Sequence, residues 1–141
     1  MAGNFIKSWQ AEVGLNHVPA YQTSGRPFAS ASVVYDDAPR AVHLPYVTRW
    51  WQIHNRGASD LRVGFSAHGL TGSSGNYYFI VPPSGSTGFG KSDIYEMKVS
   101  SLWLYGATAG TCDVVAGLTT IPTQRTSGSS GPNFSGSVGV G

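Results

Sequence analysis

Hydrophobic residues in the middle of the chain alternate with polar or small ones at a period of two, which is the pattern of half-buried β-strands. Leu61, Val63 and Phe65 lie on one side of such a segment. Leu102 and Leu104 lie on one side of another, opposite two aromatic residues. The same reading along the chain predicts eight short strands, at residues 31–35, 41–44, 47–54, 61–66, 77–81, 94–99, 102–105 and 112–118.

Turn-forming residues separate these segments. Gly, Pro, Asn and Asp gather between the predicted strands, and the breaks fall at residues 36–39, 55–57, 69–75, 82–90 and 106–110. Short strands at nearly regular spacing, with no internal repeat, predict an all-β fold. We therefore expect an antiparallel β-sandwich of the jelly-roll type, with an extended N-terminal arm and a Gly/Ser-rich C-terminal tail.

The pattern divides the chain into an N-terminal arm at residues 1–30, a sandwich domain at 31–121 and a tail at 122–141. The tail is rich in Gly and Ser, and Phe134 and Val138 are its two candidate apolar anchors. Such a segment buries too little apolar surface to order itself. It is either solvated and flexible or ordered against a partner.

The arm carries its own apolar side chains. Asn4 is a suitable N-cap for a short helix that ends at Gly14 and presents Phe5 and Trp9 on one face. A helix this short is marginal alone, so that face needs a surface, either its own sandwich or another subunit. Residues 15–28 contain Pro and Gly with little periodicity, and we expect extended, loop-like chain there.

Composition and charge narrow the class of protein. Only 11% of the residues are charged, 12% are aromatic and 19 are glycine. Disordered chains lack such aromatic content, and helical bundles carry more Ala, Leu, Glu and Lys. The formal net charge is +2 and the basic residues are scattered, so we expect neither nucleic acid nor an anionic membrane as a partner.

Compartment signals are few. Cys112 is the only cysteine, which excludes an intramolecular disulfide and fits a reducing compartment. The first ten residues lack the basic and apolar regions of a signal peptide. No stretch approaches the roughly 18 apolar residues of a transmembrane helix. We expect neither element in this chain.

The titratable residues form no catalytic motif. His43 and His54 would approach each other if their strands paired, but no histidine has the spacing of a zinc site. There is no GxSxG or Walker A sequence, and Cys112 in a predicted strand is a buried small side chain rather than a nucleophile. We expect a non-enzymatic protein without metal or cofactor; a small cupin-like enzyme is the alternative that the residues support least.

Aromatic residues on the outer faces of the predicted strands are the most distinctive chemistry. Trp50 and Trp51 are adjacent in a strand and must face opposite sides. Trp103 and Tyr105 lie opposite the leucines of their strand. Outward aromatic residues form a sugar-stacking platform or a protein interface, unless the arm covers them. Trp50, Trp103 and Tyr105 are the candidate platform.

Residues 14–28, GLNHVPAYQTSGRPF, resemble the N-terminal stretch of small virion proteins of tailed bacteriophages, marine ones especially. Residues 61–66 and 114–118 look similar to the same group. The resemblance implies a β-sandwich with a capsid accessory role, as a minor capsid, decoration or vertex protein. Minor capsid proteins of large eukaryotic DNA viruses use similar sandwiches, so the host class stays open.

The leading hypothesis is therefore a viral structural protein that binds and stabilises a capsid shell. Its partners would be the major capsid protein and other virion subunits, in many copies on the shell, and its location the virion after synthesis in the host cytoplasm. Arg26 would make a charge-assisted contact with the partner. The candidate partner-binding residues are Phe5, Trp9, Tyr21, Arg26, Phe28 and Phe134. The alternative is a carbohydrate-binding module, including one displayed on a virion.

Overall fold

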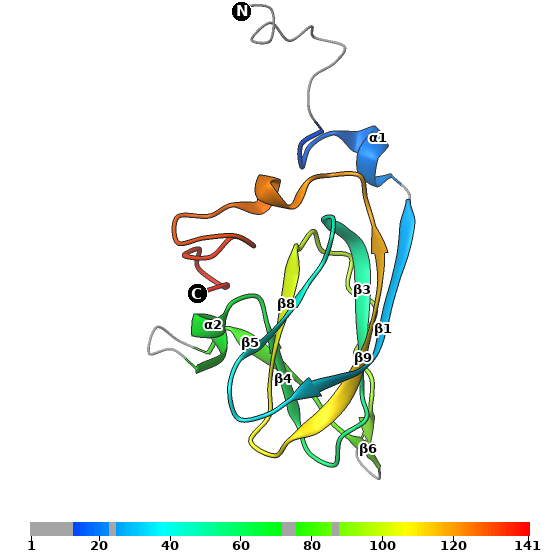
Figure 1. Ribbon diagram of the computed structural model, residues 1–141, viewed down its shortest axis with the longest axis vertical. Helices are drawn as coiled ribbons and strands as arrows, with labels where there is room; N and C mark the ends of the chain where they lie inside the picture. The colour runs from blue at the N-terminus through cyan, green and yellow to red at the C-terminus, as the bar shows by residue number, and fades with distance from the viewer. Residues whose placement is uncertain (1–12, 23–24, 72–75, 86–87) are drawn as a thin grey trace, which may run out of the picture.

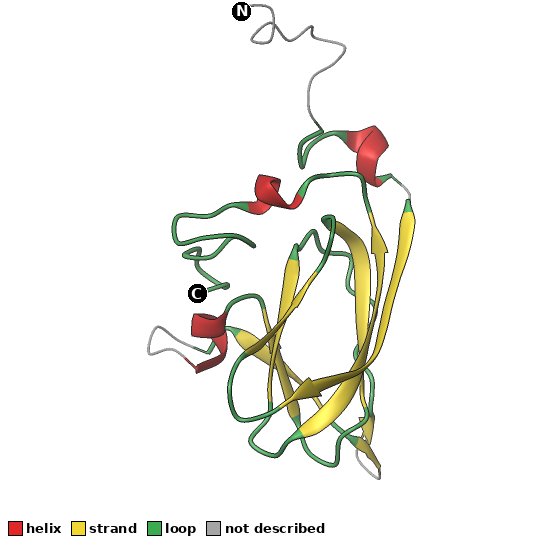
Figure 2. Cartoon of the chain, in the orientation of Figure 1, coloured by secondary structure: helices red, strands yellow, loops and turns green. Residues whose placement is uncertain are grey.

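The computed structural model describes residues 13–22, 25–71, 76–85 and 88–141 (Figure 1). The helical elements are α1 (Val18–Tyr21), α2 (Ala67–Thr71) and a 3₁₀ helix (Thr123–Thr126). The strands are β1 (Arg26–Tyr35), β2 (Arg40–His43), β3 (Thr48–Asn55), β4 (Leu61–Gly64), β5 (Tyr78–Val81), β6 (Ser84–Gly85), β7 (Gly88–Phe89), β8 (Ser101–Tyr105) and β9 (Gly110–Leu118). Strands dominate the described chain, as Figure 2 shows.

Two antiparallel sheets pack face to face and enclose the core. One has the strand order β1-β9-β3, and the other has the order β2-β8-β4-β5. A small hairpin, β6-β7, stands apart from both. The predicted all-β antiparallel sandwich is confirmed. His43 and His54 do not approach each other by strand pairing, because β2 and β3 belong to different sheets.

The alternation read from the sequence decides which side chains enter the core. Leu61, Val63, Leu102 and Leu104 are fully buried between the sheets. Trp51 is also fully buried, and its ring packs against three aromatic neighbours with centroid distances of 5.0 to 6.1 Å. Burial of this kind contributes about 1.5–3 kcal/mol for each large apolar side chain, so the two sheets are held chiefly by these contacts.

Residues 94–99 depart from the prediction of a strand. Tyr95 alone pairs with Trp51, through backbone hydrogen bonds of 2.9 and 3.0 Å. Further along, the hydroxyl of Thr48 accepts a hydrogen bond from the Val99 N–H and donates one to the Met97 carbonyl. The Thr48 hydroxyl thus takes the place of part of the backbone ladder, beside one backbone hydrogen bond of 3.0 Å from the Thr48 N–H to the Val99 carbonyl. The segment follows the β3 edge without forming a regular strand.

The first strand begins earlier than the sequence suggested. The sequence pattern places residues 26–30 in the arm and predicts loop-like chain for 26–28. These residues pair with β9, so that Arg26 lies opposite Leu118 and Phe28 opposite Ala116. The ladder with β9 satisfies backbone groups that a loop would leave to water. Helix α1, in the same part of the predicted arm, is a single turn. The helix predicted around Phe5 and Trp9 lies outside the described residues.

Strand β1 is an edge strand with a bulge. Ser32 has a φ of 58°, and the register with β9 shifts between Ser30 and Val33. The carboxylate of Asp113, on β9, accepts a hydrogen bond of 3.0 Å from the Ser32 N–H and so holds the bulge. Pro27 also lies in this strand, and proline within sheets is confined to edges and strand starts because it donates no ladder hydrogen bond.

Candidate functional site

The two sheets present different outer faces, and each carries one outward tryptophan. Trp50 pairs with Gly117 on the outside of the β1-β9-β3 sheet. Trp103 pairs with Ala41 and Gly64 on the outside of the other sheet. Both rings are half-buried, whereas Trp51 is fully buried. The prediction that Trp50 and Trp51 face opposite sides is confirmed, and the three candidate platform residues do not share one surface.

The outer face around Trp50 is a shallow apolar groove of about 340 Å³. Residues 25–29 of the β1 region form one side, Trp50 forms the other, and residues 115–117 form the floor. On the inner side of β1, Phe28 and Val33 pack against the core yet remain only half-buried. We call Pro27, Phe28, Ala29, Val33 and Trp50 the β1 surface.

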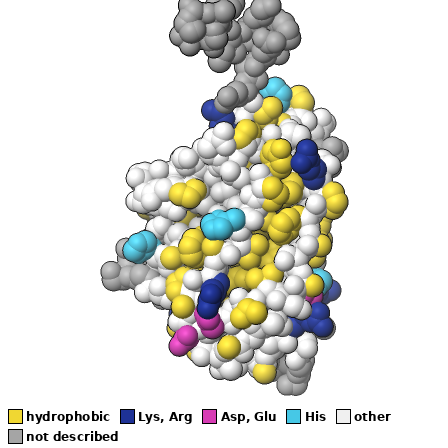
Figure 3. Space-filling view, in the orientation of Figure 1, with side chains coloured by type: hydrophobic (Ala, Val, Ile, Leu, Met, Phe, Trp, Pro, Cys, Tyr) yellow, Lys and Arg dark blue, Asp and Glu magenta, His cyan; other side chains and the backbone are white. Residues whose placement is uncertain are grey.

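The β1 surface joins an unpaired strand edge. β1 is the terminal strand of its sheet, and within the described residues no strand or isolated bridge pairs with its free side. In the space-filling view, hydrophobic side chains form a band along this side of the molecule (Figure 3). A free edge with apolar side chains beside it is a template on which another chain can add a strand.

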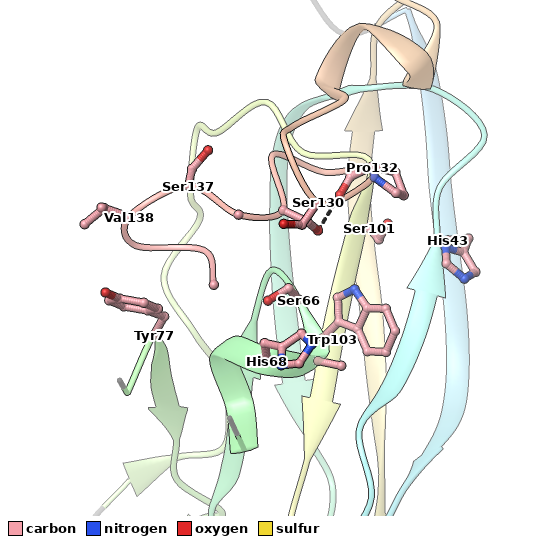
Figure 4. A pocket seen from close by; sticks show the side chains of 14 residues that line it. His43, Ser66, His68, Tyr77, Ser101, Trp103, Ser130, Pro132, Ser137 and Val138 are labelled. Carbon is pink, nitrogen blue, oxygen red and sulfur yellow. Dashed lines mark hydrogen bonds between the residues drawn. The ribbon is translucent and has the colours of Figure 1, made fainter. Parts of the chain in front are cut away.

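The outer face around Trp103 is hollow instead of flat. A cleft of about 520 Å³ opens between β8, α2 and the tail (Figure 4). Its lining is aromatic and hydroxyl-bearing, and consists of His43, Ser66, Ala67, His68, Tyr77, Ser101, Trp103, Ser130, Pro132, Ser135, Gly136, Ser137, Val138 and Gly141. We call it the Trp103 cleft. Half of its lining comes from the tail.

Asn133 fastens the tail to the sandwich. Its side chain is 1% exposed, and its Oδ1 atom accepts hydrogen bonds from the backbone N–H groups of Ser100 (2.7 Å) and Ser101 (3.2 Å). Its Nδ2 atom donates to the carbonyl oxygens of Phe65 (2.7 Å) and Ser101 (2.8 Å). The φ of Asn133 is 58°, a conformation that asparagine tolerates better than most residues. The Asn133 amide thus makes hydrogen bonds with Ser100 and Ser101 that a neighbouring strand would otherwise make.

A second contact closes the far end of the tail. The Ser66 hydroxyl donates a hydrogen bond of 2.7 Å to the Val140 carbonyl and accepts one of 3.0 Å from the Gly69 N–H. A Cβ on Gly69 would collide with the same Val140 carbonyl oxygen, so the tail can approach α2 only because this residue is glycine. The tail, for which the sequence left a solvated and a partner-ordered state open, lies here against its own sandwich.

Several polar groups in the Trp103 cleft are unused. Within the described residues, the indole N–H of Trp103, both imidazoles and the hydroxyls of Tyr77 and Ser101 make no hydrogen bond. His43 meets the Trp103 ring edge-on, with centroids 6.4 Å apart. The lining residues named above include no Asp, Glu, Lys or Arg. The cleft therefore lacks acidic, Lys and Arg side chains, and it combines the Trp103 ring with several free donors and acceptors.

Tyr105 lies further along the same strand but outside the cleft. The Arg62 guanidinium is placed between two rings, 5.0 Å from the Tyr105 centroid and 4.6 Å from that of Tyr78. Such cation–π contacts contribute roughly 0.5–1 kcal/mol at exposed sites. Arg62 thus covers the face of Tyr105 that a planar ligand would need.

The described partner-binding candidates all contact their own chain. The Lys98 ammonium lies 3.7 Å from the Tyr21 ring centroid. The Arg26 guanidinium lies 4.8 Å from the Tyr46 ring centroid. Phe28 packs against the core, and Phe134 is half-buried in the tail, where its N–H donates to the Thr126 carbonyl. Phe5 and Trp9 lie outside the described residues.

Metal-binding clusters and reactive thiols are two other kinds of site that bear on the described part of the chain. No group of three His, Cys, Asp or Glu side chains there could hold a metal ion. Cys112 is fully buried, and burial raises the pKa of its thiol to about 12, so it is not a ready nucleophile. No described helix is both long and apolar enough to cross a membrane.

Sequence reasoning missed the residues that build the cleft. Asn133 and Gly69 stood in segments predicted as tail and turn, Ser66 stood at the end of a predicted strand, and His68 looked like an isolated histidine. A weak signal was present in Pro132-Asn133, since asparagine after proline is a turn residue that bonds to backbone groups. Comparison with family models, curated proteins and solved structures gives no match to this chain. The geometry of its surfaces therefore carries the functional argument.

Proposed function

We propose that the protein is a viral structural protein that binds a capsid shell as a minor capsid, decoration or vertex protein. The observation that carries this proposal is the β1 surface: half-buried core side chains lie beside an unpaired strand edge. Exposed apolar surface rimmed by polar residues is typical of protein interfaces. An extended apolar segment of a neighbouring shell subunit would complete the sheet at β1 and contact the apolar side chains on both of its faces, Ala29 on the outer face and Phe28 and Val33 on the inner one.

The strand order supports the finer fold that such proteins use. With residues 91–95 counted beside β3, the sheets read β1-β9-β3-(91–95) and β2-β8-β4-β5. The first strand pairs with the last and the second with the next to last, which is the double Greek-key order of a jelly roll. Jelly rolls serve in viral capsids and in lectins. The resemblance of residues 14–28 to virion proteins favours the former.

The N-terminal arm would add a second contact. Phe5 and Trp9 precede the described body, and we propose that these two side chains dock on a neighbouring subunit. Many copies on one shell raise the effective concentration at each site, so two weak contacts suffice for stable binding. The low charge of the chain, 11% of its residues, lets it approach other subunits without large desolvation costs.

Co-sedimentation with empty shells of the virus that encodes the chain tests the proposal. We expect binding at a fixed ratio per shell, and a loss of about tenfold in affinity for Ala29→Glu, because a carboxylate would be buried in an apolar contact. Ile80→Glu is the matched control, since Ile80 is 50% exposed on β5 at the edge of the other sheet. Phe5→Ser with Trp9→Ser tests the arm separately. Equal binding of Ala29→Glu and wild-type protein would overturn the assignment of β1.

A further inference from the structure

The Trp103 cleft is a built site and not an accidental gap. Its outer wall is fixed at one end by the buried Asn133 amide and at the other by the Ser66–Val140 hydrogen bond. A ligand entering it would not have to order the wall first, which lowers the entropic cost of binding. Its volume of about 520 Å³ falls within the range of small-molecule sites.

The chemistry of the lining selects one class of ligand. The face of an indole carries the negative part of the ring quadrupole, and it attracts the weakly positive C–H groups on one face of a pyranose ring. Trp103 offers such a face, with an unused N–H at its edge. His68, Tyr77 and Ser101 add groups that both donate and accept, as the hydroxyls of a sugar require.

Charge separates neutral ligands from acidic ones. No Asp, Glu, Lys or Arg side chain belongs to the described lining, so a phosphate or a sugar acid would lose water without gaining a Lys or Arg partner. A purely apolar ligand would leave the hydroxyls and imidazoles without partners, at a cost for each group. A neutral polyhydroxylated ring satisfies both requirements.

We infer that the Trp103 cleft binds a neutral glycan, with one pyranose ring stacked on Trp103. Only one ring stacks, because Arg62 already occupies the face of Tyr105, the next outward aromatic residue on β8. The ligand is therefore a terminal sugar or a short oligosaccharide instead of a long chain on an extended platform. This inference is independent of the β1 surface, which lies on the other sheet.

Binding of methyl glycosides to the full-length protein tests this inference. The probes are the methyl glycosides of glucose, galactose, mannose, N-acetylglucosamine and N-acetylgalactosamine, with N-acetylneuraminic acid as the charged comparison. Saturation-transfer NMR identifies binders and calorimetric titration gives their affinity. We expect at least one neutral glycoside to bind saturably and more tightly than N-acetylneuraminic acid.

Variants then place the site. Trp103→Ala should weaken that binding by about tenfold or more, because stacking and the indole N–H are lost together. Trp50→Ala and Tyr105→Ala should bind the glycoside within about twofold of wild type. His68→Ala should reduce the affinity although the Trp103 ring is still present. Thermal unfolding of each variant separates loss of the site from loss of the fold. Absence of binding by every neutral probe at 10 mM, roughly the weakest affinity worth assigning, or equal binding by Trp103→Ala, would overturn the inference.

Discussion

The outer faces of the two sheets start from the same strand pattern and end as different surfaces. Each has an outward tryptophan on a strand whose inner residues form the core. On the β1-β9-β3 sheet no described segment folds back across the outer face, and Trp50 lies in a shallow apolar groove. On the other sheet α2 and the tail return across the face and enclose Trp103 in a cleft. The strands place the two tryptophans on the outer faces. The segments outside the strands determine what kind of surface surrounds each ring.

The difference shows that an outward aromatic residue has no function of its own. Beside a free strand edge, Trp50 widens a surface on which another protein can pack. Between hydroxyls, imidazoles and a fixed wall, Trp103 becomes the plate of a small-molecule site. The deciding features are the buried Asn133 amide and the Ser66–Val140 hydrogen bond, because together they hold the tail over only one of the sheets.

Replacing neighbouring tryptophans should give the largest contrast. Trp51→Ala removes a fully buried ring and should lower the free energy of unfolding by about 3–5 kcal/mol. Trp50→Ala and Trp103→Ala should each cost about 1 kcal/mol, the typical value for a point mutation, because these two rings are only half-buried. Urea denaturation measures all three. A cost for Trp50→Ala as large as that of Trp51→Ala would mean that the face around Trp50 is covered.

Detaching the tail should make the two faces alike. Asn133→Ala leaves the N–H groups of Ser100 and Ser101 without partners, and we expect a loss of about 2–3 kcal/mol together with rapid proteolysis after Ile121. Limited proteolysis followed by mass spectrometry locates the cuts. Ser137→Ala is the matched control in the tail, since its hydroxyl makes no hydrogen bond to a described residue. Resistance of Asn133→Ala to the protease would contradict this role.

The inner side of β9, which carries Cys112, should exclude water although the outer side of this strand is uncovered. The Cys112 thiol has an ordinary pKa of 9.0, which burial raises to about 12 in the folded protein. Between these values the unfolded state has lost the proton that the folded state keeps. The free energy of unfolding should therefore fall as pH rises above 9, by up to about 1.4 kcal/mol per pH unit.

Urea denaturation between pH 7 and 10.5 measures this slope. Cys112→Ala should show a shallower decline, and a residual one is expected from Tyr35, whose pKa burial also raises. A slope unchanged by Cys112→Ala would show that water reaches the thiol through the uncovered sheet.

Substitutions that remove electrostatic contacts should have the smallest effects on stability, and these effects should differ between sites on the surface. Arg62→Ala removes a guanidinium held between Tyr78 and Tyr105, and we expect a loss of about 0.5–1 kcal/mol. Arg40→Ala breaks an exposed ion pair with Asp36, and its effect on the denaturation midpoint should be smaller. The reverse order would show that the rings around Arg62 do not hold it.

Much of the fold could be predicted from period-two alternation. The inward positions Leu61, Val63, Leu102 and Leu104 are where the pattern places them, since one buried face per strand fixes the register. The pattern failed at residues 94–99, where the Thr48 hydroxyl replaces ladder hydrogen bonds. It also missed the start of β1, because Pro27 and the Ser32 bulge break the alternation in an edge strand.

The candidate site was predictable only in part. Trp103 stood out because it opposes the leucines of its own strand, and its outward position is confirmed. The tail that encloses it has no periodicity at all, since polar hydrogen bonds hold it and not an apolar face. Contacts such as Asn133 with Phe65, 68 residues apart in the chain, follow from tertiary structure alone.

The way the tail is held has a consequence for evolution. The Asn133 amide and the Ser66 hydroxyl fasten this wall to the sandwich, while Ser130, Ser137 and Val138 line the cleft and make no side-chain hydrogen bond within the described residues. Mutations at these three positions alter what the cleft presents and leave Asn133 and Gly69 untouched. Descendants of this sequence can therefore diversify the cleft residue by residue while natural selection preserves an unchanged sandwich beneath it.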